Sequence, residues 1–584
     1  MPASTTAIPP FERIGALHHH SPASSESEID AKVLRVKEAA GRWAALRIED
    51  RLALAGSMLA GYHRVAERSV REACDAKGIP PGTPMEGEEW TTGPWCVIRH
   101  LRLVSEVLTC IARTGTTPTG PVFTVADGRL ATRVFPSSGT DGFLFAGITA
   151  EVRFRPDMTS SAIHEARAGF YKHRSHTGRT VLVLGAGNLA SIPAMDVITK
   201  LFNEGKVCVL KMNPVNAYLG PFIEEAFADA IARGFLAVVY GGATEGAYLV
   251  RHPAIDEIHL TGSDATYDAL VWGAAGPERE ARKARNASIL AKPITAELGC
   301  VSPVLVVPGP YDSAQLAFQA EAVAGAVTSN ASFLCNAAKM IVSPRGWRRR
   351  RELLAALEGA LGRAALRDAY YPGAAERWHR LTRGRHELRT IGTPRQGQLP
   401  WALIPGLDAE NPSEAAFRTE AFCSVIGETE VASDDPLEYL TRAVDFVNAR
   451  LWGTLSATLI VHPTAMKDPV LAAAVEAAIS RLRYGTVAVN AWSGLSFAFG
   501  SPPWGAYPGA TPADIQSGTG FVHNTAMLEG VEKVVLRHPL TLRPKPVTFP
   551  SHRTAHVLGR RLVELEARPS WARAARVVAA AIRG

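Results

Sequence analysis

The chain has 584 residues and a mass of 62.5 kDa, of which 47% are hydrophobic and 20% charged. These proportions are typical of globular proteins and exclude a disordered, collagen-like or coiled-coil chain. The formal net charge is +7, but residues 543–584 alone hold nine Lys/Arg and two Glu, so the rest of the chain is balanced. A nucleic-acid-binding protein is therefore not expected.

The N-terminal residues lack a basic stretch followed by an apolar one, and no apolar run reaches about 18 residues, so neither a secretory signal nor a membrane span is predicted. Seven cysteines, an odd number, indicate reduced thiols rather than a disulfide framework. We therefore expect a cytoplasmic protein with no membrane partner. Residues 1–28, rich in Ser, Pro, Thr and Ala, are predicted to be a mobile segment, and its three adjacent histidines, His18 to His20, are not expected to form a metal site.

Apolar residues at helical spacing predict helices over 29–75 and 95–112, and short β-like runs follow over 120–160, including 142–147. From about residue 178, strands and helices alternate. The predicted strands are 181–184, 207–210, 237–240, 257–260, 304–307, 340–342, 456–461 and 486–489. The predicted helices between them include 194–203, 218–232, 265–273 and 313–328. This alternation indicates parallel sheets with crossover helices.

A glycine motif follows the strand at 181–184. Gly185-x-Gly187-x-x-Ala190 matches a Rossmann phosphate-binding loop, in which glycines let the backbone approach a pyrophosphate. Such a loop is ordinarily followed about 20 residues later by an acidic residue that binds a ribose. Here the next strand ends in Lys211 instead. An ordinary Rossmann oxidoreductase is therefore only an alternative interpretation.

Five further pieces stand in a fixed order along the chain. They are Asn188 with Lys211 23 positions later, His259-Leu-Thr-Gly262-Ser263, Ala296-Glu297-Leu-Gly299, Ser329 to Val342 around Cys335, and Arg418-Thr-Glu420-Ala-Phe-Cys-Ser-Val425. In this order and spacing, over about residues 29–540, the chain resembles the aldehyde dehydrogenase superfamily. The resemblance implies an α/β fold with a Rossmann-type parallel-sheet cofactor domain, an α/β catalytic domain and a β oligomerisation segment.

The resemblance also implies a domain division. Residues 29–296 would be an NAD(P)-binding domain with an intersubunit hairpin within about 120–175. Residues 297–500 would be the catalytic domain and 501–545 the oligomerisation segment, in a homodimer or homotetramer. Residues 546–584 form a basic C-terminal tail, predicted to be a solvated or subunit-facing helix. Residues 276–292 look like an insertion, and their Arg, Glu and Lys predict a solvated helix.

Three residues are implied to be catalytic. Cys335 matches the family nucleophile, whose thiolate attacks an aldehyde to give a thiohemiacetal and, after oxidation, a thioester that water hydrolyses. Glu297 matches the general base that activates Cys335 or the water. Branches that pass the acyl group to coenzyme A typically lack this glutamate, so hydrolysis is favoured. The amide of Asn188 would hold the oxyanion with the backbone N–H of Cys335.

Four residues are implied to bind the cofactor, and no metal is expected. Lys211 resembles the lysine on the adenine-side ribose, Gly262 and Ser263 face the pyrophosphate, and Glu420 matches the carboxylate on the nicotinamide ribose. Many NAD-preferring relatives have Glu three positions after the lysine, where this chain has Pro214. The cofactor is therefore NAD or NADP.

The expected function is NAD(P)-dependent oxidation of a small-molecule aldehyde to a carboxylic acid. An acyl-thioester (CoA) reductase of the same superfamily and a cofactor-binding non-enzyme on this fold are alternatives. Trp492, Phe497, Phe499 and Trp504 fall where the family's substrate loops lie and favour an apolar or aromatic aldehyde, unless they only pack a Gly/Pro-rich loop. Val197 replaces a family lysine nine positions after Asn188, so no proton-relay residue is predicted there.

Overall fold

The computed structural model describes residues 22–118, 120–173 and 176–584. Residues 1–21 of the predicted mobile segment, with the three histidines, lie outside the described residues, whereas residues 26–28 form the first turn of α1 (Glu26–Ala44). Within the described ranges, no helix is both long and apolar enough to cross a membrane, and no group of three or more His, Cys, Asp or Glu could hold a metal ion. All seven cysteines are free thiols, as predicted.

A parallel five-stranded sheet forms from the middle of the chain, in the order β6-β5-β4-β7-β8. Its strands are β4 (Thr180–Leu184), β5 (Val207–Lys211), β6 (Leu236–Val239), β7 (Glu257–Gly262) and β8 (Ile294–Leu298). They are Val- and Leu-rich and mostly buried, as expected for a parallel sheet covered on both faces. The four strands predicted between 181 and 260 are confirmed. Because all strands run in one direction, their carboxyl ends meet at one edge.

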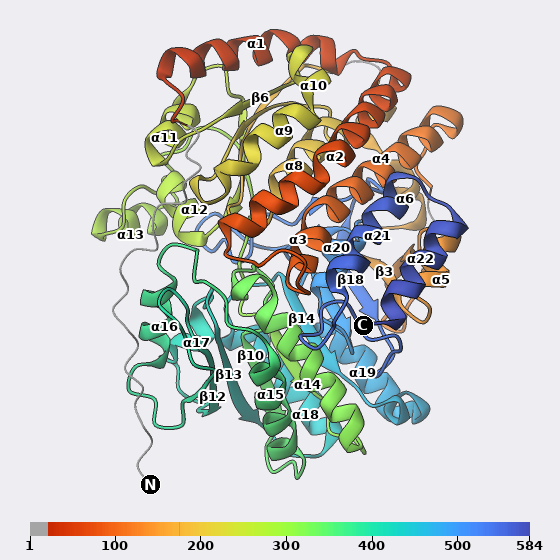
Figure 1. Cartoon of the computed structure of the whole chain (residues 1–584), viewed down its shortest axis with the longest axis vertical. Coiled ribbons are helices and arrows are strands. Elements are labelled where there is room, and N and C mark those ends of the chain that lie inside the picture. Colours follow the sequence, from red (N-terminus) through yellow and green to blue (C-terminus); the bar gives the residue numbers. More distant parts are fainter. Residues whose placement is uncertain (1–21, 119, 174–175) are drawn as a thin grey trace.

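Helices cover this sheet (Figure 1). Those packed on its strands are α1, α8 (Ile192–Ile198), α10 (Ala228–Ala232), α11 (Ala243–Arg251) and α12 (Asp264–Val271). Further helices of this part of the molecule are α2 (Ile48–Ala76), α3 (Glu86–Thr92), α4 (Pro94–Thr114), α9 (Gly220–Ala226) and α13 (Pro277–Ala284). Helix α1 packs on β5 and β6, and α2 packs on α4 and α9. The helix predicted over 218–232 is divided into α9 and α10 at Phe227. Helix α13 has no buried residue, which agrees with the solvated helix predicted for 276–292.

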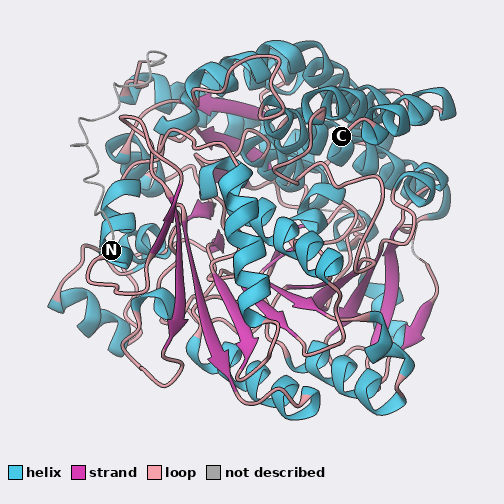
Figure 2. Ribbon diagram, turned by 60° about the horizontal axis from the view of Figure 1, so that its bottom comes forward, coloured by secondary structure: helices cyan, strands magenta, loops and turns pink. Residues whose placement is uncertain are grey.

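An eleven-stranded sheet forms the second unit, in the order β1-β2-β3-β18-β15-β14-β9-β10-β13-β12-β11. The bounds are β1 (Val122–Thr124), β2 (Leu130–Phe135), β3 (Thr149–Phe154), β9 (Pro303–Val306), β10 (Met340–Pro344), β11 (Arg389–Ile391), β12 (Trp401–Leu407), β13 (Val425–Val431), β14 (Ser456–Ile460), β15 (Thr486–Val489) and β18 (Val531–Arg537). Strands β18 to β12 are parallel, and the outer strands are antiparallel. Figure 2 shows its strands fanned out between helices. These helices include α14 (Ser313–Thr328), α15 (Arg350–Arg363), α16 (Ala374–Thr382), α17 (Ala415–Arg418), α18 (Pro436–Arg450) and α19 (Pro469–Arg481).

The segment 120–175 contributes β1, β2 and β3, of which β3 pairs antiparallel with β18 of the same chain. Its contact with another subunit stays a prediction. Helices α6 (Ser160–Ala166) and α7 (Gly169–Lys172) follow. The β-like run predicted at 142–147 is wrong, because residues 139–144 form α5 (Gly139–Leu144). The hydroxyl of Ser138 caps this helix by accepting from the Asp141 N–H at 3.1 Å.

The basic C-terminal tail folds into α21 (Ala555–Ala567) and α22 (Trp571–Ile582), which differ from the predicted solvated or subunit-facing helix. Helix α21 packs against α3 and α4 of its own chain. Two glycines allow this close approach: a Cβ at Gly559 would lie 2.6 Å from the Cβ of Trp90, and one at Gly87 would lie 2.5 Å from the backbone of Ala555. The apolar face of the tail is therefore used within the chain, and its basic residues face outward.

A buried ion cluster fastens α21 to the body. The guanidinium of Arg99 on α4 pairs with Asp141 at 2.8 Å and with Glu566 of α21 at 2.6 Å, and it donates to the carbonyl of Phe499 at 2.6 Å. Arg102 pairs with the other Glu566 oxygen at 2.6 Å. The partners raise the pKa of Arg99 above its ordinary value despite burial. One glutamate thus compensates two arginines that burial has removed from water.

We expect Glu566→Ala to lower the free energy of unfolding by about 3–5 kcal/mol, because it leaves the buried Arg99 without one of its two counter-charges. Guanidinium unfolding followed by tryptophan fluorescence measures the change. Glu564→Ala on the same helix is the matched control: Glu564 is a third exposed and, among the residues that the structure describes, forms an ion pair with Arg561 alone, so its loss should cost under about 1 kcal/mol. Equal effects of the two variants would contradict a structural role for the cluster.

Candidate active site

The loop before Cys335 has a strained backbone. Asn330, Ala331 and Ser332 have φ angles of 51°, 53° and 74°, in the left-handed region that side chains other than glycine rarely adopt. The buried ammonium of Lys339 holds this turn by donating to the Ser332 carbonyl at 3.2 Å and to the Cys423 carbonyl at 2.9 Å. The strain is maintained by specific bonds, which is typical of functional loops.

A second buried ammonium supports the same loop from the helical side. Lys77, just after α2, pairs with Glu89 of α3 at 2.8 Å and donates to the side-chain oxygen of Asn330 at 3.2 Å. The amide of Asn330 in turn donates to the backbone carbonyl of Asn188 at 2.9 Å. The loop that carries Cys335 is thus joined to the 185–190 loop and to α3.

Cys335 and Glu297 are brought together at the end of β8. Both side chains line the same cavity, and the indole N–H of Trp504 donates to Glu297 Oε1 at 3.2 Å. Burial raises the pKa of Glu297 to about 7, although the neighbouring Cys335 and Trp504 side chains lower it. Burial and the neighbouring Glu297 raise the pKa of the Cys335 thiol well above its usual value. The pair therefore combines a thiol that needs a base with a carboxyl group that titrates near neutrality.

Asn188 lies beside the Cys335 loop, and its side-chain amide donates to the Phe333 carbonyl at 3.0 Å. A primary amide has two N–H donors, so this bond leaves a second one. Within the described residues, the backbone N–H of Cys335 has no hydrogen-bond partner. Asn188 is buried and does not line the cavity above Cys335. The second amide N–H of Asn188 and the backbone N–H of Cys335 thus lie on two loops that hydrogen bonds join. Their role in binding the oxyanion stays a prediction.

Lys211, Gly262 and Ser263 lie along the carboxyl edge of the five-stranded sheet. Lys211 ends β5, and burial lowers the pKa of its ammonium to about 8, which the Glu245 carboxylate partly opposes. Gly262 ends β7 and is exposed, and Ser263 caps α12 by accepting from the Thr266 N–H at 3.2 Å. The open start of α12 offers backbone N–H groups of the kind that bind phosphate.

By contrast, the backbone of the glycine motif at 185–190 is covered by other residues and is not accessible to a ligand. Residues 185–190 are all buried, and a Cβ at Gly187 would lie 2.6 Å from the side-chain oxygen of Asn213. The Asn216 amide donates to the Ala186 carbonyl at 2.8 Å. Since no pyrophosphate can reach this loop, the ordinary Rossmann interpretation is wrong: these glycines serve packing, not phosphate binding.

Glu420 is half-buried and lies beside Gly299, just after the end of β8. Its Oε1 has no hydrogen-bond partner within the described residues, and a Cβ at Gly299 would overlap its carboxyl group. Burial raises the pKa of Glu420 to about 8, although Lys339 lowers it. A carboxyl oxygen that is buried without a hydrogen-bond partner is costly. Glu420 Oε1 is therefore available to accept a hydrogen bond from a bound molecule.

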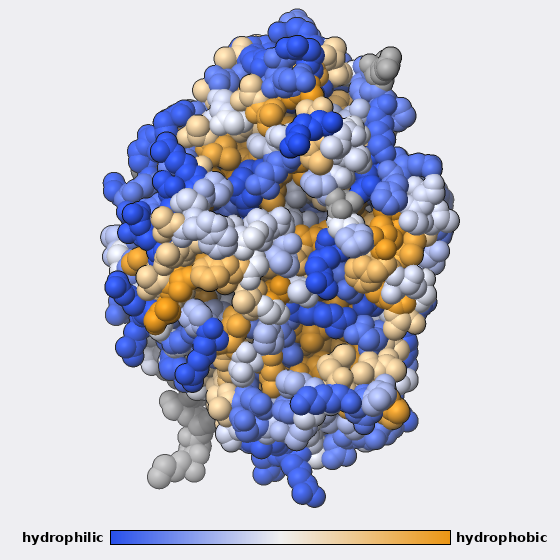
Figure 3. Space-filling model, turned by 90° about the vertical axis from the view of Figure 1, so that its right-hand side faces the viewer, coloured by the Kyte–Doolittle hydropathy of each residue, from blue (hydrophilic) through white to orange (hydrophobic). Residues whose placement is uncertain are grey.

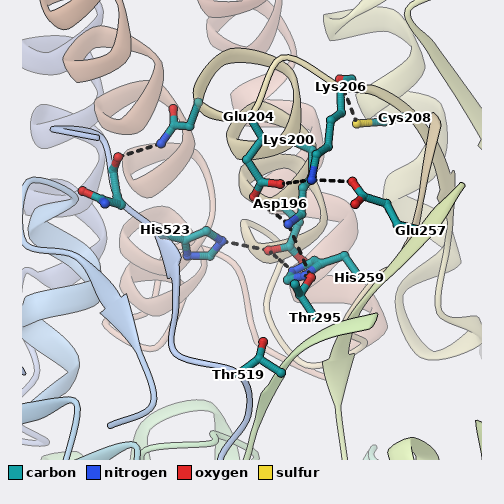
Figure 4. A network of polar contacts seen from close by, with 12 residues as sticks. Asp196, Lys200, Glu204, Lys206, Cys208, Glu257, His259, Thr295, Thr519 and His523 are labelled. Atoms are coloured by element: carbon teal, nitrogen blue, oxygen red, sulfur yellow. Dashed lines mark hydrogen bonds and ion pairs between the residues drawn. The ribbon is translucent and has the colours of Figure 1, made fainter. Parts of the chain in front are cut away.

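A buried polar network beside the cavity was not predicted (Figure 4). His523 Nε2 lies 2.8 Å from Asp196 Oδ1, and the carboxylate also accepts from Thr261 at 3.0 Å. His259 Nε2 lies 3.4 Å from Asp196, and its Nδ1 lies 2.8 Å from the Thr295 hydroxyl. His523 lines the cavity, and its Nδ1 has no partner within the described residues.

The network continues to the edge of the sheet through charged groups. Lys200 pairs with Glu204 at 2.6 Å, and Lys206 joins Glu204 at 2.7 Å and also pairs with Glu257. Asp196, the neighbour of Val197, was not predicted as a site residue. The only signal was one acidic residue inside the apolar helix 192–198, because its histidine partners lie far away in sequence.

An apolar cavity of about 360 Å³ opens above Cys335. Its lining includes Trp95, Cys96, Phe143, Leu144, Phe145, Leu189, Ile192, Glu297, Leu334, Cys335, Trp492, Leu495, Phe497, Ala498, Phe499, Trp504, His523, Leu542, Pro546, Val547, Leu558, Leu562, Val577, Val578 and Ala581. The four aromatic residues predicted for the substrate loops are among them, on or beside α20 (Gly494–Phe499) and the small sheet of β16 (Trp504–Gly505) and β17 (Phe521–His523).

Comparisons with known proteins agree with this architecture. Residues 181–361 match the family model described as the aldehyde dehydrogenase family, and no curated protein matches the chain. The NADP-dependent glyceraldehyde-3-phosphate dehydrogenase of Bacillus halodurans, solved with NADP, is 18% identical, with 88% of this chain and 92% of that chain covered and a TM-score of 0.55.

Two further solved structures are similar. An aldehyde dehydrogenase of Mycobacterium tuberculosis, solved with NAD+, is 18% identical, with coverages of 88% of this chain and 90% of that chain and a TM-score of 0.58. An NAD-dependent aldehyde dehydrogenase of Sinorhizobium meliloti is 18% identical, with coverages of 90% and 89% and a TM-score of 0.56. At such identities the likeness establishes the fold, and the predicted α/β fold class is confirmed.

Proposed function

We propose that this chain, whose residues 181–361 match the aldehyde dehydrogenase family model, is an aldehyde dehydrogenase. It would oxidise an aldehyde to a carboxylic acid through a thioester on Cys335, with NAD or NADP as the electron acceptor. The observation that carries this proposal is that Cys335 and Glu297, a thiol and a carboxyl group with a pKa near neutrality, line the same apolar cavity. The predicted division into cofactor and catalytic domains, a homodimer or homotetramer and a cytoplasmic location belong to the same proposal.

The residues of the chain account for the bond changes. Glu297 takes the thiol proton, and Cys335 Sγ bonds to the aldehyde carbon, so the carbonyl oxygen becomes an oxyanion. The second amide N–H of Asn188 and the backbone N–H of Cys335 stabilise that oxygen. Loss of the carbon-bound hydrogen with two electrons leaves a thioester. Glu297 then gives the thiol proton to solvent and takes a proton from water, whose oxygen bonds to the thioester carbon and displaces the Cys335 thiolate as the acid forms. The thiolate takes that proton back from Glu297, which restores the starting pair.

The cofactor edge fits a dinucleotide. Glu420 offers an unpaired oxygen for ribose hydroxyls, Lys211 stands at the end of β5, and the exposed Gly262 and half-buried Ser263 leave the start of α12 open to a pyrophosphate. A bound NAD(P) supplies the acceptor for the two electrons and the hydrogen removed from the substrate carbon. The protein's contribution is to bind it and orient it against Cys335.

The presence of Glu297 favours hydrolysis over transfer of the acyl group to coenzyme A. The direct test is a panel of aldehydes with NAD and NADP in parallel, with and without coenzyme A, followed by the absorbance of the reduced cofactor. We expect reduction without coenzyme A and formation of one acid per reduced cofactor. A strict requirement for coenzyme A would instead support the acyl-thioester reductase.

The pH profile should follow Glu297. A base must be deprotonated to act, and burial raises the pKa of this carboxyl group to about 7. Below that pH, kcat should therefore fall by about tenfold per pH unit, and above it kcat should level off. Steady-state rates between pH 5 and pH 9 test this (an assay window spanning about two units on either side of the pKa). A profile that is flat across neutrality would contradict Glu297 as the base.

For the cofactor, we expect NADP to bind at least comparably to NAD. Pro214 is exposed three positions after Lys211, so no carboxylate stands there to repel a 2′-phosphate. A carboxylate about 4 Å away would cost about 1–4 kcal/mol. Pro214→Glu should therefore weaken NADP by at least about fivefold and leave NAD nearly unchanged, as measured by quenching of tryptophan fluorescence.

Glu245 provides the control for this cofactor prediction. Its carboxylate accepts from the Gly242 N–H at 2.6 Å and acts on the pKa of Lys211. If the wild type prefers NAD by more than about a hundredfold, the prediction is wrong. Recovery of NADP binding in Glu245→Gln would then assign the repulsion to this residue.

A further inference from the structure

The cavity above Cys335 extends to the C-terminal helices. Cys335 and Glu297 line one part of it, and Leu562 of α21 with Val577 and Ala581 of α22 line another. Its volume of about 360 Å³ is in the range of small-molecule sites. Because the carbon that reacts must reach Cys335 Sγ, the remainder of a bound substrate points toward α21 and α22.

The wall contributed by α21 and α22 is apolar, whereas Arg543 in the preceding loop also lines the cavity and is exposed. Leu558 and Leu562 from α21 and Val577 from α22 are buried. Lys545 also lies along this wall, but its ammonium donates to the Ser551 carbonyl at 3.2 Å and is used within its own loop. Such a wall favours methylene groups over polar ones, since each removes apolar surface from water.

The cavity also reaches the molecular surface. Phe143 lines it and is 54% exposed, and its ring packs edge-on against Trp571 of α22 at 5.7 Å. Figure 3 looks onto the side that carries α5 and α22, where apolar residues lie among hydrophilic ones. A tail longer than the cavity can therefore leave it beside Phe143.

The wall is built into the fold rather than loosely attached. The Arg99–Glu566 pair and the close packing at Gly87 and Gly559 fix α21 against α3 and α4. A preformed apolar wall spares a ligand the cost of ordering it.

We propose that the C-terminal helices α21 and α22 form the specificity wall of this site and that the substrate is an aldehyde with a long, unbranched aliphatic tail. This inference rests on the proposed function, since it names the substrate class of the same site. The aldehyde group lies at Cys335 and the tail lies along the wall formed by α21 and α22. The wall sets affinity for the tail and takes no part in the bond changes.

The first measurement is kcat/KM for propanal, butanal, hexanal and decanal with the wild-type protein. Each added methylene should raise kcat/KM about fourfold until the cavity is filled. The second compares Ala581→Trp, which fills the cavity from α22, with Ala579→Trp. Ala579 is exposed on the same helix and does not line the cavity, so it is the matched control.

We expect Ala581→Trp to reduce kcat/KM for decanal at least about tenfold, because the indole displaces at least two methylene groups that are each worth about fourfold. Propanal should be oxidised as by the wild type, and Ala579→Trp should change neither rate. A flat wild-type profile, or equal behaviour of the two tryptophan variants, would overturn the proposal while propanal oxidation still supports the proposed function.

Binding of hexan-1-ol, measured by calorimetry, tests the wall without turnover. We expect heat of binding for the wild type and Ala579→Trp and none for Ala581→Trp. If no aldehyde is oxidised but this pattern holds, the proposed function fails and the apolar site stands. If hexan-1-ol binds none of the three proteins, or all three alike, the site assignment is wrong.

Discussion

Cys335→Ala is expected to abolish aldehyde oxidation while cofactor binding stays close to that of the wild type. Without Sγ no thiohemiacetal or thioester forms, and loss of covalent catalysis costs many orders of magnitude. Lys211, Ser263 and Glu420, which we propose to bind the cofactor, lie on other elements and are unchanged. Reduced-cofactor absorbance gives the rate, and quenching of tryptophan fluorescence gives the affinity for NAD and NADP.

Cys110→Ala is the control for this variant. Cys110 is a partly exposed free thiol on α4 that does not line the cavity, so its removal should leave turnover unchanged. If Cys335→Ala keeps more than about a tenth of wild-type turnover, Cys335 is not the nucleophile.

Glu297→Gln is expected to reduce kcat by about 10²–10⁴-fold, the usual contribution of a positioned base. Glutamine keeps the size of the side chain and can still accept from Trp504, but it cannot take a proton from the thiol or from water. The pH dependence near neutrality should disappear with the carboxyl group, because burial sets the pKa of Glu297 to about 7.

Rapid-mixing kinetics distinguish the two steps in which Glu297 could act as a base, which are deprotonation of the Cys335 thiol and deprotonation of the hydrolytic water. If it acts mainly on water, Glu297→Gln should give a burst of reduced cofactor near one per active site, followed by slow turnover. If it acts mainly on the thiol, the burst itself should be slow. Glu564→Gln, which alters an exposed residue of α21, is the control and should match the wild type. Normal turnover by Glu297→Gln would show that another group is the base.

The strands of the cofactor sheet could be predicted because their signal is local. The Val- and Leu-rich runs that form β4 to β7 are short, buried and separated by helices, so periodicity and spacing specify them. The prediction for 142–147 failed because Phe143 and its neighbours are apolar, while the capping hydroxyl of Ser138 and the Arg99–Asp141 pair decide the helix. Tertiary contacts of this kind are not visible in a short window.

The site was predicted as a set of separate motifs. They were assigned to one site because their order and spacing resemble those of the aldehyde dehydrogenase superfamily. Cys335 and Glu297 indeed meet, whereas the glycines at 185–190 turned out to be buried. Asp196 and His523 escaped notice because 327 positions separate them. The wall formed by α21 and α22 was not predicted for the same reason. A basic amphipathic segment predicts a surface helix, and its packing on α3 and α4 involves residues that are far away in the sequence.

The central claim is that Cys335 carries the acyl group as a thioester. Glu297→Gln mixed with an aldehyde and NAD or NADP, quenched in acid and digested, allows the peptide that contains Cys335 to be weighed by mass spectrometry. We expect the mass of this peptide to increase by the mass of the aldehyde less two hydrogens. The added group should be located on Cys335 and absent from the double variant Glu297→Gln/Cys335→Ala. Reduced cofactor without any such adduct, or an adduct on another residue, would contradict it.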